Sequence, residues 1–439
     1  MSTRQNNGKG RGIGKISMEV RKMQKGLKKI GVGLVAVGLC LALLATACIP
    51  QAVNARPAEE PIYIGMTDDF TGPIAQSIMF CGLGVIDYAR WLSEKEGGID
   101  GHKIEVIWED TRSLVPRTII AFKRMVARGI VYHIDGTTIT TETILPRAQR
   151  EEIPIGIWGA VTPGEITKPM WVFNMLSGWG LGAVGAVKWF KDNWAEPRPL
   201  RAGLMTVDYS SGWDMVAGME EYCPKLGVEF VGYEVCPMVP AAIDTSVEWL
   251  RLAAKNPDLI IMYAAGTTLV TLVKDPARLG IQEKGVTLCN IGTIEEKVLE
   301  VVGKSAEGWY VSCPATVFVS VERELPGAKR ILAAAKEYRG WGPDTVPITY
   351  VYGWVVCQVG VEAIRIALAQ VGYENLTGRA VREGFVSIRD FDVGGIAPPV
   401  TVSDRRPYFN DSSKMYEIQQ GKIMPVGDWT KLPFLLEIE

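Results

Sequence analysis

Strand-like and helix-like segments alternate along most of this 439-residue chain, and the alternation runs through two successive series. The first series opens with an apolar strand pattern at 61–65 and closes with another at 153–158. The second runs from a helix pattern at 183–193 to a strand pattern at 286–290. Such alternation is typical of parallel sheets covered by crossover helices. Two series in one chain therefore predict an α/β protein with two lobes.

The N-terminus has the order of an export signal. A stretch rich in Lys and Arg is followed by an uncharged run over 30–47, which ends in small residues directly before Cys48. Basic, then apolar, then small residues are typical of a secretory signal peptide. The alternative is an uncleaved anchor helix, since about 18 apolar residues can cross a bilayer. Both interpretations place the rest of the chain outside the cytoplasm, tethered to a membrane.

The sequence Ala45-Thr46-Ala47-Cys48 resembles a lipobox, in which the cysteine sulfur is acylated after cleavage. It departs from that pattern at Ala45, where Leu is usual. The resemblance implies a signal peptide over 1–47, lipidation of Cys48 and a tether over 48–60.

Composition excludes several classes of protein. A formal net charge of −2 leaves no basic surplus for nucleic acid. The 47% apolar and 22% charged residues are globular proportions, and no stretch after Cys48 is expected to span a membrane. With only His102 and His133, a histidine-based metal site is not expected, and no cofactor is predicted.

Six cysteines follow Cys48, namely Cys81, Cys223, Cys236, Cys289, Cys313 and Cys357. Export permits disulfides, and Cys223 with Cys236 or Cys289 with Cys313 are the sequence-near pairings. A set of buried free thiols is equally compatible with the spacing.

Two turns after strands carry polar or small residues. Thr140 and Thr141 belong to a threonine-rich turn that follows the strand ending at Asp135, and Ala160 to Thr162 follow the next strand. Hydroxyls and backbone amides at a helix start favour an anion, whereas one threonine serving as a helix cap is the alternative. In the second series Tyr209 and Tyr263 end strands, which predicts an aromatic wall that faces the hydroxyls; packing of either tyrosine in the core is the alternative.

A glycine pattern at 180–185 matches the dinucleotide-binding fingerprint, with Asp208 ending the next strand. This would indicate a nucleotide-dependent oxidoreductase. Asp208 comes later than the usual spacing, and an exported protein lacks a ready supply of that cofactor. We therefore favour the interpretation that these glycines allow close packing of a helix, and we do not expect an enzyme.

The order of several short motifs resembles the extracellular solute-binding proteins of ABC importers, specifically the branched-chain amino-acid-binding (Leu/Ile/Val-type) family of periplasmic binding fold type I. The likeness covers 62–429 and rests on Ile64-Gly65, Thr71-Gly72-Pro73, Gly97-Gly98-Ile99-Asp100-Gly101, Glu109-Asp110, Ala306-Glu307-Gly308, Gly421-Lys422 and Asp428-Trp429.

The resemblance implies two Rossmann-like lobes with parallel sheets, joined by a hinge of three chain crossings. The implied crossings and lobes are as follows: crossings near Ser177, Pro314 and Gly394, a first lobe of 61–177 plus 314–393, and a second lobe of 178–313 plus 394–439.

It also implies a ligand site between the lobes. The candidate ligand-binding residues are Thr140, Thr141, Ala160, Val161, Thr162, Ser77, Tyr209, Ser211, Tyr263 and Ile291. Thr141 and Thr162 are the expected hydroxyl donors to a ligand carboxylate, with Ala160 supplying a backbone contact.

The acidic residue that amino-acid binders use for the ligand ammonium has no match at 290–293, and the first carboxylate after this stretch is Glu295. We therefore expect an uncharged-headed acid, an amide or an aromatic carboxylate, unless Asp68 or Asp69 meets an amine. The implied function is a lipid-anchored receptor that closes on a small solute and delivers it to the membrane subunits of an ABC importer. A sensor that feeds a signalling protein is the alternative.

Overall fold

The computed structural model describes residues 60–166 and 168–434, all within one compact unit, Arg56–Glu439. The predicted signal peptide, the predicted lipidation site Cys48 and nearly all of the predicted tether lie outside the described residues.

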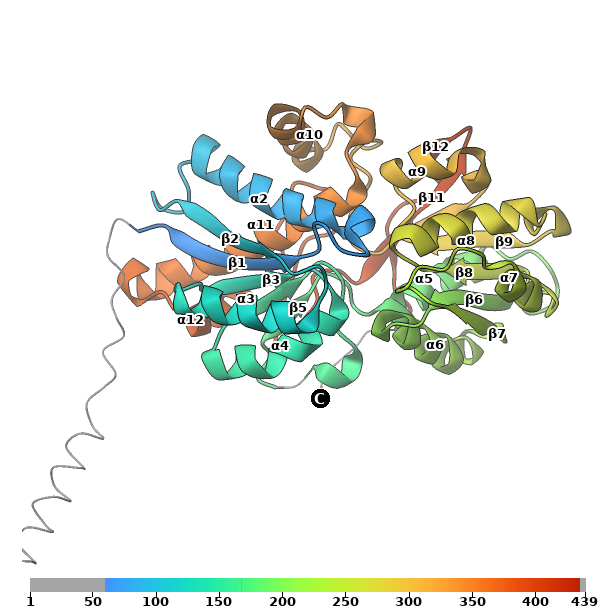
Figure 1. The fold of residues 1–439 in the computed structure, drawn as a ribbon, viewed down its shortest axis with the longest axis horizontal. Helices are drawn as coiled ribbons and strands as arrows, with labels where there is room; N and C mark the ends of the chain where they lie inside the picture. Colours follow the sequence, from blue (N-terminus) through green and yellow to red (C-terminus); the bar gives the residue numbers. More distant parts are fainter. Residues whose placement is uncertain (1–59, 167, 435–439) are drawn as a thin grey trace, which may run out of the picture. The chain divides into compact units, whose positions relative to one another are not determined.

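The first lobe is built on a five-stranded, wholly parallel sheet with the strand order β2-β1-β3-β4-β5. Its strands are β1 Ile62–Asp68, β2 Ile104–Asp110, β3 Tyr132–Asp135, β4 Ile155–Ile157 and β5 Val172–Asn174. Its helices are α2 Ala75–Lys95, α3 Val115–Ala127, α4 Thr138–Glu151, α10 Pro326–Arg339, α11 Ile348–Val371 and α12 Gly378–Val386. Helices α3 and α4 lie together on one face, and α2 packs with α11 on the other (Figure 1).

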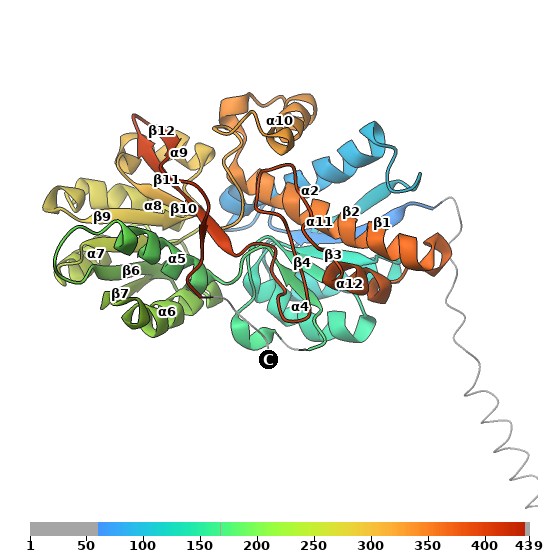
Figure 2. The same ribbon diagram turned by 180° about the vertical axis from the view of Figure 1, so that it is seen from behind.

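The second lobe contains an eight-stranded sheet in which seven strands follow the order β12-β11-β10-β9-β8-β6-β7, and β13 pairs with β11. Its strands are β6 Arg201–Val207, β7 Glu229–Cys236, β8 Leu259–Met262, β9 Thr287–Ile291, β10 Tyr310–Cys313, β11 Ser412–Gln419, β12 Lys422–Pro425 and β13 Thr430–Lys431. Strands β6 to β10 are parallel, whereas β11 runs antiparallel to its neighbours (Figure 2).

The helices of the second lobe are α5 Trp179–Asp192, α6 Ser210–Tyr222, α7 Ser246–Ala253, α8 Gly266–Arg278 and α9 Glu296–Val302. Single 3-10 turns occur at Pro163–Glu165, Pro224–Leu226, Gln282–Lys284, Gly303–Ala306, Pro343–Thr345 and Tyr373–Asn375. Strand β8 is apolar and buried at all four positions, as expected for a parallel strand covered on both faces. The predicted α/β fold with two parallel-sheet lobes is confirmed.

Helix α11 corrects one expectation. By length and composition it is apolar enough to cross a membrane, although no such stretch was expected after Cys48; 83% of its most apolar window is buried in the protein. A Cβ on Gly353 would lie 1.8 Å from the carbonyl oxygen of Cys81 in α2, and one on Gly84 would lie 2.1 Å from that of Tyr350. The two backbones touch at these glycines, so α11 is a core helix of the first lobe.

The chain crosses between the sheets three times. The first crossing joins β5 to α5 and the second follows β10, close to the expected Ser177 and Pro314. The third comes later than the expected Gly394, because the carbonyl of Gly394 still accepts a hydrogen bond from Gly327 N at 2.8 Å in the first lobe. The chain then runs beside β5 and enters the second sheet at β11.

One side chain ties two of these crossings together. The Asn410 amide donates to the carbonyl oxygens of Pro314 and Ala315 at 3.0 and 3.3 Å. The second and third crossings therefore lie side by side, as in a common hinge.

Candidate functional site

Two small adjoining cavities lie between the lobes, and together they are called the interlobe cleft here. Each has a free volume of about 20 Å³, and they share a wall that includes Ile78, Trp158, Trp179 and Tyr263. Trp158 directly follows β4, and Tyr263 directly follows β8. The cleft therefore lies at the carboxyl ends of strands from both sheets, where open α/β folds bind ligands.

The two lobes touch at this cleft. The backbone N–H of Gly266, at the start of α8, donates to Ser77 Oγ in α2 at 2.6 Å. A free volume of about 20 Å³ holds little more than a water molecule. A solute larger than that can enter only when the lobes separate.

Aromatic rings form most of the shared wall. The Trp158 ring centroid lies 6.2 Å from that of Trp179, edge to face, and 6.3 Å from that of Tyr352, nearly parallel. Trp179 and Tyr263 follow at 4.6 Å. Trp158 Nε1 is buried and has no hydrogen-bond partner among the described residues. This wall suits a flat or apolar solute body and offers one open N–H donor.

Glu295 brings a carboxylate into the cleft. Its Oε2 accepts hydrogen bonds from Thr349 N at 3.1 Å and from Thr349 Oγ1 at 2.8 Å, at the start of α11. Its Oε1 is buried and has no partner among the described residues. Burial, reinforced by the adjacent Glu296, raises the pKa of Glu295 to about 8. Among the described residues, the lining of the cleft contains no basic side chain, so this carboxyl group favours a solute with a cation or an N–H donor.

The other end of the cleft is formed by the turn after β3. Gly136, Thr137 and Thr138 line it, opposite Tyr209 and Ser211 from the second lobe. Thr137 caps α4, and the first-turn amides of this 14-residue helix favour negative charge. The cleft thus offers an anion-attracting end and a carboxylate end, with the aromatic wall between them.

Thr140 and Thr141 are completely occupied within the first lobe. Their hydroxyls donate to Asp135 Oδ2 at 2.6 and 2.8 Å, and Thr67 donates to the other carboxylate oxygen. Burial raises the pKa of Asp135, while the threonine hydrogen bonds oppose this shift. Both threonines are buried and neither lines the cleft, so in this structure they stabilise a buried carboxyl group.

The next turn is also engaged internally. The Ala160 carbonyl accepts from Thr138 Oγ1 at 3.0 Å and from Trp179 Nε1 at 3.2 Å, while Val161 N donates to Asn174 Oδ1. Thr162 donates from both N and Oγ1 to the carboxylate of Glu142, each at 2.9 Å. These contacts position the turn and its neighbouring tryptophan.

The structure separates the sequence-predicted residues into two groups. Ser77, Tyr209, Ser211, Tyr263 and Ile291 line the interlobe cleft, whereas Thr140, Thr141, Ala160, Val161 and Thr162 lie behind it. Asp68 and Asp69 do not reach it either, because Asp69 accepts hydrogen bonds from the backbone of its own turn and Asp68 accepts from Asp69 N.

Several cleft residues were not predicted, chief among them Trp179, Tyr352, Thr349 and Glu295. The sequence carried a signal for Glu295, as the first carboxylate after β9. Thr349 and Tyr352 lie on α11, and only the packing of that helix against α2 brings them to the cleft.

The glycine pattern at 180–185 serves helix packing. The Asp214 carboxylate accepts the Gly180 N–H at 2.9 Å, at the position where a dinucleotide would place its phosphates. A Cβ on Gly180 would lie 2.5 Å from the Asp214 carbonyl oxygen, which is the close contact between α5 and α6. This geometry favours the packing interpretation over the oxidoreductase.

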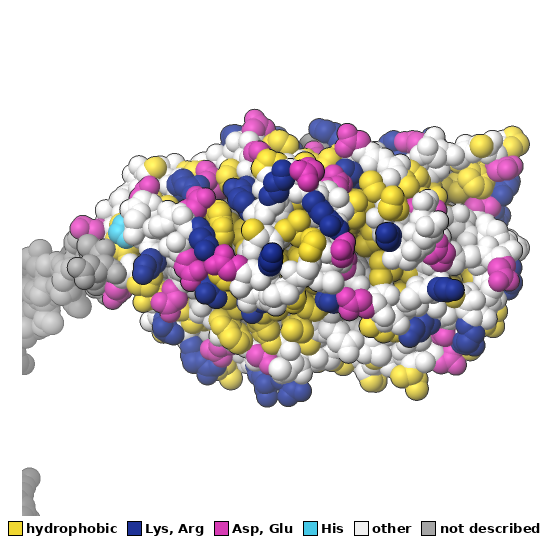
Figure 3. Space-filling model, turned by 90° about the horizontal axis from the view of Figure 1, so that it is seen from above, with side chains coloured by type: hydrophobic (Ala, Val, Ile, Leu, Met, Phe, Trp, Pro, Cys, Tyr) yellow, Lys and Arg dark blue, Asp and Glu magenta, His cyan; other side chains and the backbone are white. Residues whose placement is uncertain are grey.

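The six cysteines of the described residues are buried free thiols. The described part of the chain holds no cluster of His, Cys, Asp or Glu side chains suited to a metal ion. On one face, acidic and basic side chains alternate closely, in keeping with the small net charge (Figure 3).

The periplasmic binding protein family matches residues 61–422, so the chain belongs to that family of solute-binding proteins. The recognition made from the sequence motifs is thereby confirmed. No curated protein sequence matches the chain.

Solved structures share the fold at low sequence identity. A branched-chain amino-acid ABC transporter protein from Thermus thermophilus with bound valine has a TM-score of 0.75 and 16% identity, covering 85% of this chain and 97% of that one. An ABC transporter substrate-binding protein from Aeropyrum pernix has a TM-score of 0.74 and 18% sequence identity, and the match covers 86% of this chain and 97% of that one. A fatty acid ABC transporter substrate-binding protein from Thermomonospora curvata has a TM-score of 0.71 and 16% sequence identity, and the match covers 87% of this chain and 96% of that one.

Proposed function

We propose that this protein is a lipid-anchored, extracytoplasmic receptor that closes on a small organic solute and delivers it to an ABC importer. The solute class is one with a flat or apolar body and an amine or amide group, such as an amino acid or an amide. The observation that carries this proposal is the interlobe cleft, in which an aromatic wall stands beside the partly unpaired carboxyl group of Glu295.

The cleft chemistry changes the solute expected from sequence, because Glu295 lines the cleft and offers an acidic group to a solute amine. An amine or amide N–H can donate to Glu295 Oε1, which has no partner among the described residues. A buried carboxyl oxygen that accepts no hydrogen bond destabilises the protein, and an N–H group of the solute would remove this cost. A solute carboxylate would be favoured at the start of α4, which makes a zwitterion the solute that satisfies both ends.

Closure links binding to delivery. The Ser77–Gly266 hydrogen bond and the Glu295–Thr349 pair both connect the lobes. A solute that contacts both walls binds the closed form better and shifts the population toward it. A permease that recognises the closed form would then receive only the loaded receptor. The similar solved structures include substrate-binding proteins of ABC transporters, which supports this partner.

The solute is tested by a thermal-shift screen of the purified protein against amino acids, amides, aromatic acids, fatty acids and nicotinamide cofactors. A ligand at 100 times its dissociation constant adds about 2.7 kcal/mol of stability. We expect a shift with an amine or amide class, and Glu295→Gln should weaken that binding about ten- to hundredfold.

Glu300→Gln is the matched control, because Glu300 is exposed and pairs with Lys297 outside the cleft. Binding of a simple carboxylate that is equally tight in wild type and Glu295→Gln would contradict the role of Glu295. A shift with a nicotinamide cofactor alone would contradict the receptor.

The lipid anchor is tested separately at Cys48. Membrane fractionation of cells that express wild type or Cys48→Ala should find the wild type with the membrane. The variant should be released or retained with its signal uncleaved. Identical fractionation and identical mature mass would contradict lipidation at Cys48.

A further inference from the structure

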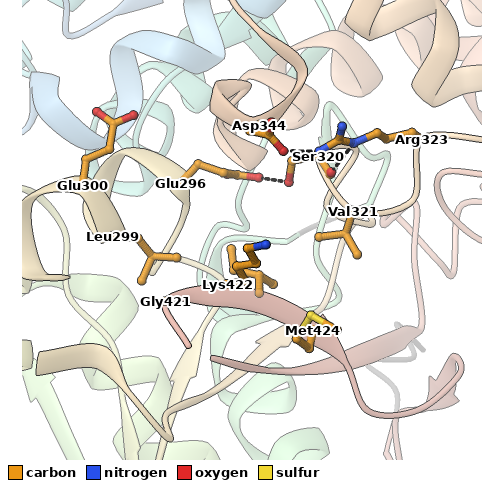
Figure 4. A pocket seen from close by; sticks show the side chains of 11 residues that line it. Glu296, Leu299, Glu300, Ser320, Val321, Arg323, Asp344, Gly421, Lys422 and Met424 are labelled. Atoms are coloured by element: carbon orange, nitrogen blue, oxygen red, sulfur yellow. Dashed lines mark hydrogen bonds and ion pairs between the residues drawn. The ribbon is translucent and has the colours of Figure 1, made fainter. Parts of the chain in front are cut away.

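A cavity much larger than the interlobe cleft lies elsewhere, beside helix α9 and strand β12. Its free volume is about 510 Å³, and it is called the outer cavity here. Helix α9 and strand β12 of the second lobe form one side, and the chain that leads from β10 toward α11 forms the other (Figure 4). Leu299, Val321, Ile423 and Met424 give it an apolar surface.

Two consecutive acidic residues line different cavities. Glu295 lines the interlobe cleft and Glu296 lines the outer cavity. Since α9 begins between them, the two side chains leave the backbone in different directions. The same turn of chain thus places one acidic group on each side.

Glu296 is only partly satisfied by the protein. It is 8% exposed, and Ser320 Oγ donates to its Oε1. Its Oε2 has no hydrogen-bond partner among the described residues. Burial raises the pKa of Glu296 to about 7. A buried carboxyl oxygen without a donor is costly, so a cationic or N–H-bearing ligand would be stabilised beside it.

The other charged side chains of the outer cavity either form ion pairs within the protein or are exposed to solvent. Arg323 pairs with Asp344 and donates to the Ser320 carbonyl, and Glu300 pairs with Lys297 at 2.8 Å. Lys422 is exposed, and a long exposed lysine can turn its ammonium into water. The charge left for a ligand is that of Glu296.

We propose that the outer cavity is a second small-molecule site, which binds a primary amine carrying a short apolar chain. The ammonium group pairs with Glu296, and the chain packs on Leu299, Ile423 and Met424. The site is separate from the solute cleft and does not depend on the identity of the transported solute.

A ligand-observed NMR titration of the full chain with n-butylammonium tests this site, with butyrate and 1-butanol as matched probes. We expect butylammonium to bind at least about tenfold more tightly than either probe, because only it supplies a charge-assisted hydrogen bond. Glu296→Gln should weaken its binding about tenfold or more. Glu295→Gln should leave it unchanged, because Glu295 lines the interlobe cleft and not the outer cavity.

A second variant keeps Glu296 intact. Met424 is 42% exposed at the edge of the cavity, so Met424→Trp should fold normally and block the site, with the same loss of binding. Absence of butylammonium binding to the wild type would overturn the proposal. Loss in Glu295→Gln but not in Glu296→Gln would also overturn it, by assigning the amine to the interlobe cleft, and would leave the proposed function standing.

Discussion

The threonine turn after β3 and the Glu295 side of the cleft use polar groups in opposite ways. In the turn, Thr67, Thr140 and Thr141 all donate to Asp135, so the chain satisfies its own carboxyl group. On the other side, Glu295 Oε1 and Trp158 Nε1 have no partner among the described residues, although both residues line a cavity. The difference shows that a cluster of hydroxyl groups has a structural role when its hydrogen bonds are all made within the protein. Groups left open beside a cavity are the stronger indication of a ligand.

The largest effect expected from a single substitution is on the hydrogen-bond network around Asp135. Asp135→Ala removes the acceptor of three buried hydroxyls, and we expect it to lower the free energy of unfolding by about 3 kcal/mol. Urea denaturation measures this loss. Thr143→Ala is the control, because the Thr143 side chain is on the exposed face of α4 and should change stability by less than about 0.5 kcal/mol. A small stability loss combined with a large loss of solute affinity would instead assign the turn to ligand binding.

On the Glu295 side of the cleft, we expect the free energy of unfolding to depend on pH. Glu295 has a folded-state pKa of about 8, above its unfolded value of 4.5. The folded state then holds a proton that the unfolded state has lost, so this group's contribution is complete below pH 4.5. It falls as pH rises toward 8, by about 1.4 kcal/mol per pH unit.

Unfolding of wild type and Glu295→Gln, measured across this window, checks the sign. The wild type should lose stability relative to Glu295→Gln as pH rises, and Glu300→Gln should follow the wild type. Parallel pH profiles for wild type and Glu295→Gln would show that Glu295 has an ordinary pKa.

A smaller effect is expected at the contact between the lobes. Ser77→Ala removes the acceptor of the Gly266 N–H, and we expect it to disfavour closure by about 1 kcal/mol. Small-angle X-ray scattering without solute should show a larger radius of gyration than in the wild type. An unchanged radius would mean that this bond does not govern closure.

The smallest effect is expected at Thr162. Its hydroxyl donates to Glu142, which also accepts from Thr162 N, so Thr162→Ala loses one of two parallel bonds. We expect a loss of affinity below about threefold for any solute found in the screen. A tenfold loss, measured by calorimetry, would restore Thr162 as a direct ligand contact.

The sequence was a good guide to the fold because local patterns carry it. Buried apolar strands and crossover helices each have a characteristic hydrophobic periodicity. Elements such as β8 and α8 can therefore be recognised without knowledge of the elements that they pack against. The short helix α12 was not foreseen. The third crossing was placed too early, because its position depends on how far the chain follows β5 before it leaves the first lobe.

The candidate site was predicted less well. Tyr209, Tyr263 and Ile291 could be placed at the cleft because they stand at strand ends, which a parallel sheet brings to one edge. Whether a threonine hydroxyl faces a solute or a buried aspartate is a matter of side-chain direction, which spacing along the chain does not encode.

The sequence alone determined the α/β class, the two lobes, the family and the edge of the sheets at which the interlobe cleft lies. All of these follow from periodicity and motif order along the chain. Only the tertiary structure decided which polar groups are already paired and which remain open. Hydrogen-bond partners such as Thr349 for Glu295 come from distant segments, so their pairing exists only after the lobes have packed.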